Sequence, residues 1–194
     1  MGKRKHDDDD EPPRHAAARR GDEGGIRALV AAGADVNEMA PLLDAPDGAF
    51  PRAVTPLMVA AGSGEGATAE TLRLLCSLGA DPNATRDHGF TVLMTAASSL
   101  SRDVEVLRLL VDHGADPHAV SEYGGNVLHA AVDVNGAEAN SPDCVRAILG
   151  YLHGLGVSLE QRDRQGMTPM ERAGWKGTAV ENKVLAELCR HRRP

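Results

Sequence analysis

The residues most capable of chemistry are four polar side chains in one short stretch: Asp112, His113, Asp116 and His118. Imidazole and carboxylate groups bind divalent metals, but a zinc site needs three or four ligands that converge on one ion. Gly114 separates the two pairs and predicts a turn between them. We therefore interpret His113 as an exposed base at a helix end and His118 as a turn residue, and we expect no metal site.

An acidic run near the amino end, Asp7 to Glu11, could hold a divalent cation through its carboxylates. The run has no glycine turn and no fixed ligand spacing, so such binding would be weak and nonspecific. Residues 1–13 also lack apolar side chains to bury, which predicts a disordered charged tail. Within it, Lys3, Arg4 and Lys5 could act as a nuclear localisation signal, although such signals usually contain about five to eight basic residues.

Motifs for covalent or phosphoryl chemistry are missing from the sequence. It contains no G-x-S-x-G, no P-loop and no G-x-G-x-x-G after a strand. Gly21, Gly24 and Gly25 predict a loose turn between two short helices. We expect no catalytic residues, no cofactor and no enzymatic activity.

Composition favours a reducing compartment and a protein partner. Cys76, Cys144 and Cys189 are odd in number and far apart, and no apolar leader follows Met1. No stretch approaches the roughly eighteen apolar residues of a membrane span. A net charge of −7 argues against nucleic-acid binding and favours a partner with a basic surface. We therefore expect a cytoplasmic monomer that binds another protein, with the nucleus as an alternative location through the basic cluster.

Two repeated phrases indicate which elements must position the polar residues. Gly-Ala-Asp turns begin at Gly33, Gly79 and Gly114, and a weaker copy begins at Gly156. A second phrase, Thr or Asn followed by apolar and small residues, begins at Thr55, Thr91, Asn126 and Thr168. The interval between the two phrases is constant except for one insertion after the first turn.

The physics of the phrases predicts where helices begin and end. A Thr or Asn oxygen accepts from a free N–H at a helix start, and a following proline suits the first turn. Apolar residues at helical spacing, such as Leu107, Leu110 and Val111, precede each turn glycine, which can adopt a left-handed conformation. Each unit is therefore predicted to be a pair of short helices, although the first unit opens with Ala16 and lacks the Thr-Pro start.

Together these phrases resemble the ankyrin repeat, with its T-P-L-H-x-A pattern and its period of about 33 residues. The resemblance extends from about Arg14 to the carboxyl end, although the His of the pattern occurs only as His129. It implies an all-α ankyrin-repeat solenoid of stacked helix-turn-helix units with hairpin-like loops, and implies that His129 bridges neighbouring turns. The domain would span 14–194, in about five units including caps: 14–50, 51–85, 86–120, 121–162 and 163–194.

The resemblance also implies that a partner contacts the hairpin tips and the first-helix face on the concave side. The corresponding residues are Arg86, Asp87, His88, Phe90, Glu122, Tyr123, Asp133, Arg162, Arg164, Gln165, Met167, Trp175 and Lys176. Among these, Phe90, Tyr123 and Trp175 could either anchor a partner or cover a neighbouring repeat.

These observations favour an interaction module or adaptor that binds a protein through the concave face. The alternative is a stoichiometric inhibitor, or a regulatory or targeted effector that acts through its tail and its loop insertions. The insertions lie within 38–52, 64–69 and 133–143. Insertions in a repeat protein form loops on one face, where they either cap the stack or contact the partner.

Overall fold

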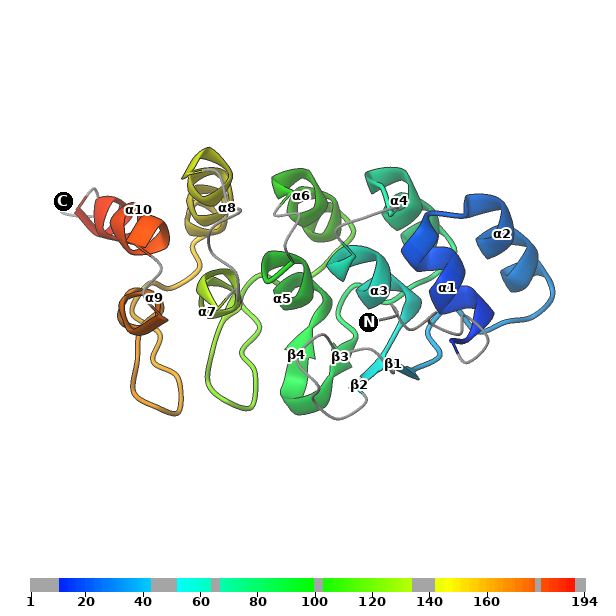
Figure 1. Cartoon of the computed structure of the whole chain (residues 1–194), viewed down its shortest axis with the longest axis horizontal. Coiled ribbons are helices and arrows are strands. Elements are labelled where there is room, and N and C mark those ends of the chain that lie inside the picture. The colour runs from blue at the N-terminus through cyan, green and yellow to red at the C-terminus, as the bar shows by residue number, and fades with distance from the viewer. Residues whose placement is uncertain are drawn as a thin grey trace, which may run out of the picture.

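The computed structural model of the protein describes residues 11–42, 52–63, 67–99, 103–133, 142–176 and 179–190. For residues 42, 52, 142, 144, 174–176 and 179–182 it describes the backbone alone. Within these ranges the chain forms five successive pairs of helices, arranged in two layers (Figure 1).

One layer contains the first helix of each pair: α1 (Pro13–Arg20), α3 (Pro56–Gly62), α5 (Val92–Ala97), α7 (Val127–Val132) and α9 (Pro169–Lys176). The outer layer contains the second helices: α2 (Glu23–Ala31), α4 (Ala69–Ser77), α6 (Val104–Asp112), α8 (Pro142–Gly154) and α10 (Ala179–Arg190). Two loops carry short antiparallel strands: β1 (Ala40–Leu42) pairs with β2 (Arg52–Val54), and β3 (Thr85–Arg86) pairs with β4 (Phe90–Thr91). The predicted all-α solenoid of helix pairs with hairpin-like loops is confirmed.

The helix boundaries follow the two repeated phrases. Thr55 Oγ1 accepts from Met58 N at 3.3 Å, and Thr91 Oγ1 accepts from Met94 N at 3.1 Å. The four turn glycines lie just after the second helices, with φ between 82° and 95°. Residues with a Cβ atom adopt this left-handed backbone conformation at a steric cost, which explains why glycine recurs there.

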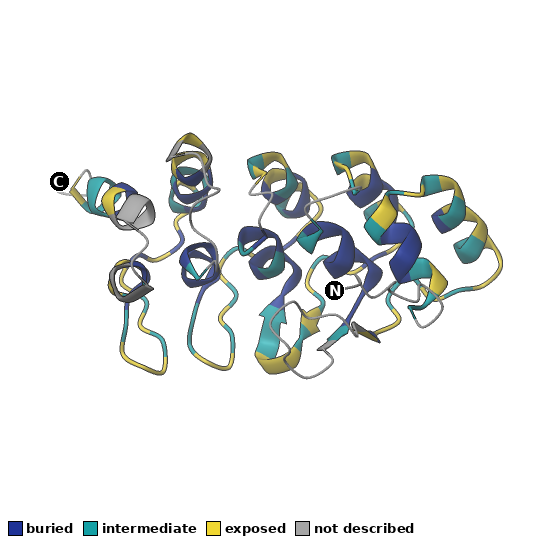
Figure 2. Ribbon diagram, in the orientation of Figure 1, coloured by how far each residue is buried: buried dark blue, intermediate teal, exposed yellow. Residues whose placement is uncertain are grey.

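The core extends along the whole stack instead of surrounding one centre. Figure 2 shows that buried residues gather where the two layers of helices meet. Small buried side chains on the first helices let neighbouring units approach closely: Ala60, Ala61, Ala96, Ala97, Ala130 and Ala131. Each first helix packs against the first helices of adjacent units, and the outer helices pack in the same way. Among the described residues the main contacts between helices are within a unit or between adjacent units, so the fold is a linear array.

The first unit starts earlier than the sequence suggests. Helix α1 begins at Pro13, where proline suits the first helical position because the missing N–H would have no helical partner there. Glu11 forms an ion pair with Arg19 near the end of the same helix. Glu11 thus belongs to the folded array and not to the acidic tail.

The prediction of a loose turn at Gly21, Gly24 and Gly25 is wrong for two of the three glycines. Helix α2 begins at Glu23, so residues 24 and 25 lie in its first turn. Asp22 caps this turn, with its Oδ1 accepting from Gly25 N at 2.9 Å. The cap offsets the poor helix propensity of the paired glycines.

Asparagine side chains connect successive turns of the first three units. Asn37 Nδ2 donates to Gly79 O at 3.0 Å, and its Oδ1 accepts from Asp81 N at 2.8 Å. Asn83 makes the same two bonds to the next turn, each 2.8 Å long. His118 occupies the next equivalent position, and its side chain makes no corresponding bonds within the described residues. The series of turn bonds therefore stops between the third and fourth units.

Replacing His118 with asparagine is expected to raise the free energy of unfolding by about 1 kcal/mol, the net value of one or two exposed hydrogen bonds. The new side chain would reach Gly156 O and Ser158 N, and Gly156 has the same left-handed conformation as the other turn glycines. Urea denaturation of both proteins measures the change. The reverse substitution, Asn83→His, should lower the free energy of unfolding by a similar amount. Equal urea midpoints for His118→Asn and the parent protein would contradict the expectation.

Candidate functional site

Three loops, each joining an outer helix to the next first helix, lie side by side along one edge of the stack (Figure 1). They comprise residues 85–91, 120–126 and 162–168, and we call them the hairpin ridge. Glu122 N donates to His88 O at 2.8 Å, and Arg164 N donates to Tyr123 O at 2.7 Å. Because main-chain bonds join each loop to the next, the predicted partner-binding residues that belong to these three loops lie on one continuous ridge.

Close backbone packing fixes the shape of the hairpin ridge. Gly124 has φ 75°, and a Cβ at this position would lie 3.3 Å from backbone atoms of Arg162, Asp163 and Arg164. His88 is the one residue other than glycine with positive φ among the described residues, at 62°. A residue other than glycine rarely adopts this backbone conformation, so the surrounding loop must hold His88 in it.

The aromatic residues of the hairpin ridge differ in exposure. Tyr123 is 50% exposed, with the His88 ring centroid 4.7 Å from its own and the Arg164 guanidinium 5.6 Å away. Phe90 is half-buried against the core, and the guanidinium of Arg86 lies 4.1 Å from its ring centroid. Of the two roles open to these aromatics, Phe90 covers a repeat, whereas Tyr123 presents its ring to solvent.

Several other predicted residues of the ridge are exposed and charged or polar. His88 Nδ1 lies 3.2 Å from Glu122 Oε2, and both side chains are more than half exposed. Asp87, Arg164 and Gln165 are exposed as well. These side chains remain available to a partner at little cost, since exposed polar contacts contribute little to stability.

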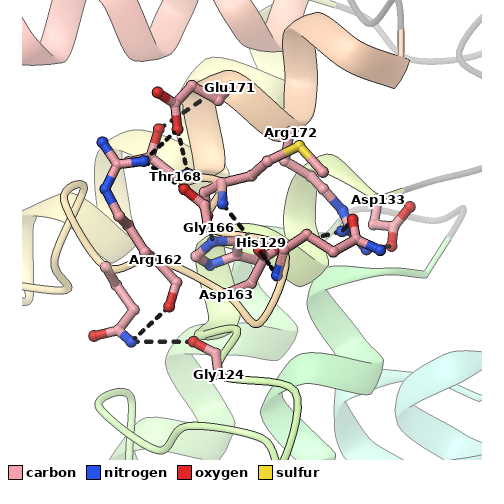
Figure 3. A network of polar contacts seen from close by, with 12 residues as sticks. Gly124, His129, Asp133, Arg162, Asp163, Gly166, Thr168, Glu171 and Arg172 are labelled. Atoms are coloured by element: carbon pink, nitrogen blue, oxygen red, sulfur yellow. Dashed lines mark hydrogen bonds and ion pairs between the residues drawn. The ribbon is translucent and has the colours of Figure 1, made fainter.

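An ion-pair network at the carboxyl end of the hairpin ridge was not predicted from the sequence (Figure 3). Arg172 on α9 donates to Asp163 Oδ2 and to Asp133 Oδ2, both at 3.0 Å. The side chain of Asp163 is only 7% exposed. Asp163 Oδ1 also accepts from Gln165 N at 2.9 Å and from Met167 N at 3.0 Å. Arg172 and Asp163 thus hold the last loop against the fourth unit.

A capping box begins α9 next to this network. Thr168 Oγ1 accepts from Glu171 N at 3.3 Å, and Glu171 Oε2 accepts from Thr168 N at 2.8 Å. The Thr168 N–H bond is the main reason that the pKa of Glu171 lies below its usual value. The same carboxylate accepts from Arg162 at 3.0 Å. The Thr-x-x-Glu spacing is a known helix-start signature, so this contact was within reach of sequence analysis.

The network engages four of the predicted partner-binding residues, among them Gln165, whose Oε1 accepts from Arg172 at 3.0 Å. Asp133 contacts Arg172, Arg162 contacts Glu171, and Met167 supplies backbone bonds to the loop. Trp175 and Lys176 belong to α9, and their side chains lie outside the described residues. The inserted segments also fall partly outside, at residues 43–51, 64–66 and 134–141.

Two buried histidines connect first helices to the loop of the following unit. His129 Nε2 lies 3.0 Å from Met167 O, which confirms the expected bridge between turns. His15 Nε2 lies 2.8 Å from Val54 O, the equivalent carbonyl at the boundary between the first and second units. The bridge from His15 was not predicted, although His15 precedes two alanines just as His129 does. Burial lowers the pKa of both imidazoles.

Stability is expected to fall as the pH drops below about 6.5, the ordinary value for histidine. A base whose folded pKa is lowered binds fewer protons in the folded state, so its contribution is complete above the unfolded pKa and is lost on acidification. The loss is at most about 1.4 kcal/mol per histidine per pH unit. Urea midpoints at pH 7.5 and 5.5 measure it.

The matched variant carries His15→Met and His129→Met, because buried Met58 and Met94 occupy the equivalent positions of the second and third units. Its urea midpoint should change less between the two pH values than that of the parent protein. An equal change in both proteins would assign the pH dependence to other groups.

The residues that first suggested metal chemistry lie at a helix end and in a turn. His113 Nδ1 is 2.9 Å from Leu109 O, on its own helix. No group of three His, Cys, Asp or Glu side chains is placed to hold a metal within the described ranges. Nor is any helix in this part of the chain long and apolar enough to cross a membrane.

Comparison with known proteins agrees with this architecture. The sequence matches the family described as ankyrin repeats (3 copies) over residues 15–121 and 57–151, which together cover more than half of the chain. No curated protein matches the sequence. With its stacked helix pairs, capped helix starts and recurring glycine turns, the chain belongs to the ankyrin repeat family.

Proposed function

We propose that this protein is an adaptor or interaction module that binds a partner protein through the hairpin ridge and the adjoining ends of the first helices. Ankyrin repeats generally bind other proteins, and proteins built from them are typically not enzymes. The observation that carries the proposal is the exposed ring of Tyr123 between His88 and Arg164. Tyrosine and arginine are the side chains that most often dominate interface energies.

The rigidity of the hairpin ridge supports this function. Hydrogen bonds between the loops hold Tyr123 and its neighbours before any partner arrives. Binding then costs little conformational entropy, because these loops do not have to become ordered. A few exposed anchors on a preformed surface are sufficient for specific association.

We also propose that the protein works as a monomer in the cytoplasm. Cys76 is a free thiol, which fits a reducing compartment. Burial raises the pKa of the Cys76 thiol and so reduces its reactivity. An inhibitor or effector role through the tail and insertions remains the alternative, and deleting residues 1–10 tests the tail: lost binding or altered location would favour this alternative.

The test combines affinity purification from the native cell with binding measurements on the purified partner. Tyr123→Ala is expected to weaken binding by about 2 kcal/mol, roughly thirty-fold. Tyr151→Ala is the matched control, because Arg108 lies over the Tyr151 ring at 4.7 Å in the outer layer. Circular dichroism checks that both variants fold. Equal affinities for the parent protein and Tyr123→Ala would refute binding through the hairpin ridge.

A further inference from the structure

We propose that Arg164, beside the ring of Tyr123, binds a carboxylate of the partner, so that the bound segment is acidic although the chain itself carries a net charge of −7. This inference rests on the proposed function, because it names the chemistry of the segment that the hairpin ridge binds. It reverses the expectation from overall composition, which favoured a basic partner.

The ion pairs of the last loop distinguish Arg164 from its neighbours. Arg162 contacts Glu171, and Arg172 contacts two aspartates (Figure 3). Within the described residues, the guanidinium of Arg164 contacts the Tyr123 ring and no carboxylate. Arg164 is therefore an exposed cation on the hairpin ridge whose charge is not neutralised by the fold.

The contact with Tyr123 prepares this guanidinium for a carboxylate. A guanidinium is planar, and its N–H donors match the two oxygens of a carboxylate; a neighbouring aromatic ring limits the orientation of that plane. The ring also excludes water from one side of the pair, which strengthens the electrostatic attraction. Tyr123 is half exposed, so it can cover an aliphatic side chain next to that carboxylate.

A second arginine on the same surface has a similar arrangement. Arg86 lies over Phe90 in the loop of residues 85–91. His88 lies between these two residues in the chain, and its ring is against the Tyr123 ring. The three loops of the hairpin ridge contain three arginines and three carboxylates, so their formal charge is zero and not acidic like the whole chain.

The carboxylates of the ridge leave Arg164 accessible. Asp163 is buried against Arg172, and the carboxylate of Glu122 contacts His88. Neither of these carboxylates, nor the exposed Asp87, forms an ion pair with Arg164 within the described residues. An acidic segment would therefore meet Arg164 as the uncompensated cation in this part of the surface, with Tyr123 as its apolar neighbour.

The test selects random twelve-residue peptides displayed on phage against the full-length protein. We expect the selected peptides to be enriched in Asp or Glu next to an aliphatic residue. Fluorescence polarisation with these peptides should show an affinity loss of about tenfold for Arg164→Gln, the size expected for one charge-assisted hydrogen bond. Arg108→Gln, which removes the arginine over Tyr151, should leave the affinity unchanged.

A charge exchange makes the assignment specific. The substitution Arg164→Glu should abolish binding of the acidic peptide. The variant protein should instead bind a version of the peptide in which lysine replaces the acidic residue. Selected peptides that are basic, or acidic peptides that bind Arg164→Gln as well as the parent protein, would overturn the carboxylate site. If the basic peptides still require Tyr123, the proposed ridge function survives; if no selected peptide depends on Tyr123, both inferences fail.

Discussion

Replacing Arg172 with methionine is expected to lower the free energy of unfolding by about 2 to 3 kcal/mol. The substitution keeps an apolar stem of similar length but leaves Asp163 buried without its cation. Asp163 is 7% exposed and Arg172 21% exposed, so water can replace the lost contact only in part. Asp133 loses its bond to Arg172 at the same time. Chemical denaturation followed by circular dichroism measures the change.

The control for this prediction is Arg146→Met. Arg146 on α8 pairs with Glu187 on α10 at 2.6 Å and so also connects the fourth and fifth units. Its side chain is 58% exposed, and exposed ion pairs contribute about 0 to 1 kcal/mol. If the free energy of unfolding falls by the same small amount in both variants, burial of Asp163 does not determine how much the network contributes to stability.

Leu93→Ala in the middle unit is expected to destabilise the array by about 3 kcal/mol, because Leu93 is 1% exposed and its removal leaves a cavity. Leu185→Ala in the last unit removes an equally buried side chain. The loss of stability caused by Leu93→Ala should extend to the units on both sides. The loss caused by Leu185→Ala should lead to local unfolding of the last unit alone. The difference follows from an array in which the main contacts between helices are within a unit or between adjacent units.

Hydrogen exchange with mass spectrometry separates these outcomes. Leu185→Ala should speed exchange in residues 169–190 while residues 92–132 keep their protection. Leu93→Ala should speed exchange in α3, α5 and α7 together. Uniformly faster exchange in the Leu185→Ala variant would show that the whole array opens as one unit.

The sequence predicted those features that depend on a few neighbouring residues. Thr55 and Thr91 begin helices through bonds to residues three positions away, and the turn glycines end them. The bridge from His129 followed from the resemblance to a family pattern. Local hydrogen bonds and backbone conformation leave regular marks along the chain, and such marks can be found without coordinates.

Contacts that depend on how loops fold were not predictable in this way. Arg172 meets Asp133 across 39 positions, and nothing in their spacing indicates that contact. His15 was missed for a different reason: Pro12 stands where threonine or asparagine begins the other units, so the match began too late. The exposure of Tyr123 and the partial burial of Phe90 likewise depend on side-chain packing between loops.

The main-chain bonds between the loops have a consequence for how such a surface can change over generations. Glu122 and Arg164 connect to the preceding loop through backbone N–H groups, which every residue except proline provides. Their side chains can therefore be exchanged while the scaffold beneath them persists. Point mutations at the loop tips can therefore change the binding specificity of this protein while its fold is retained.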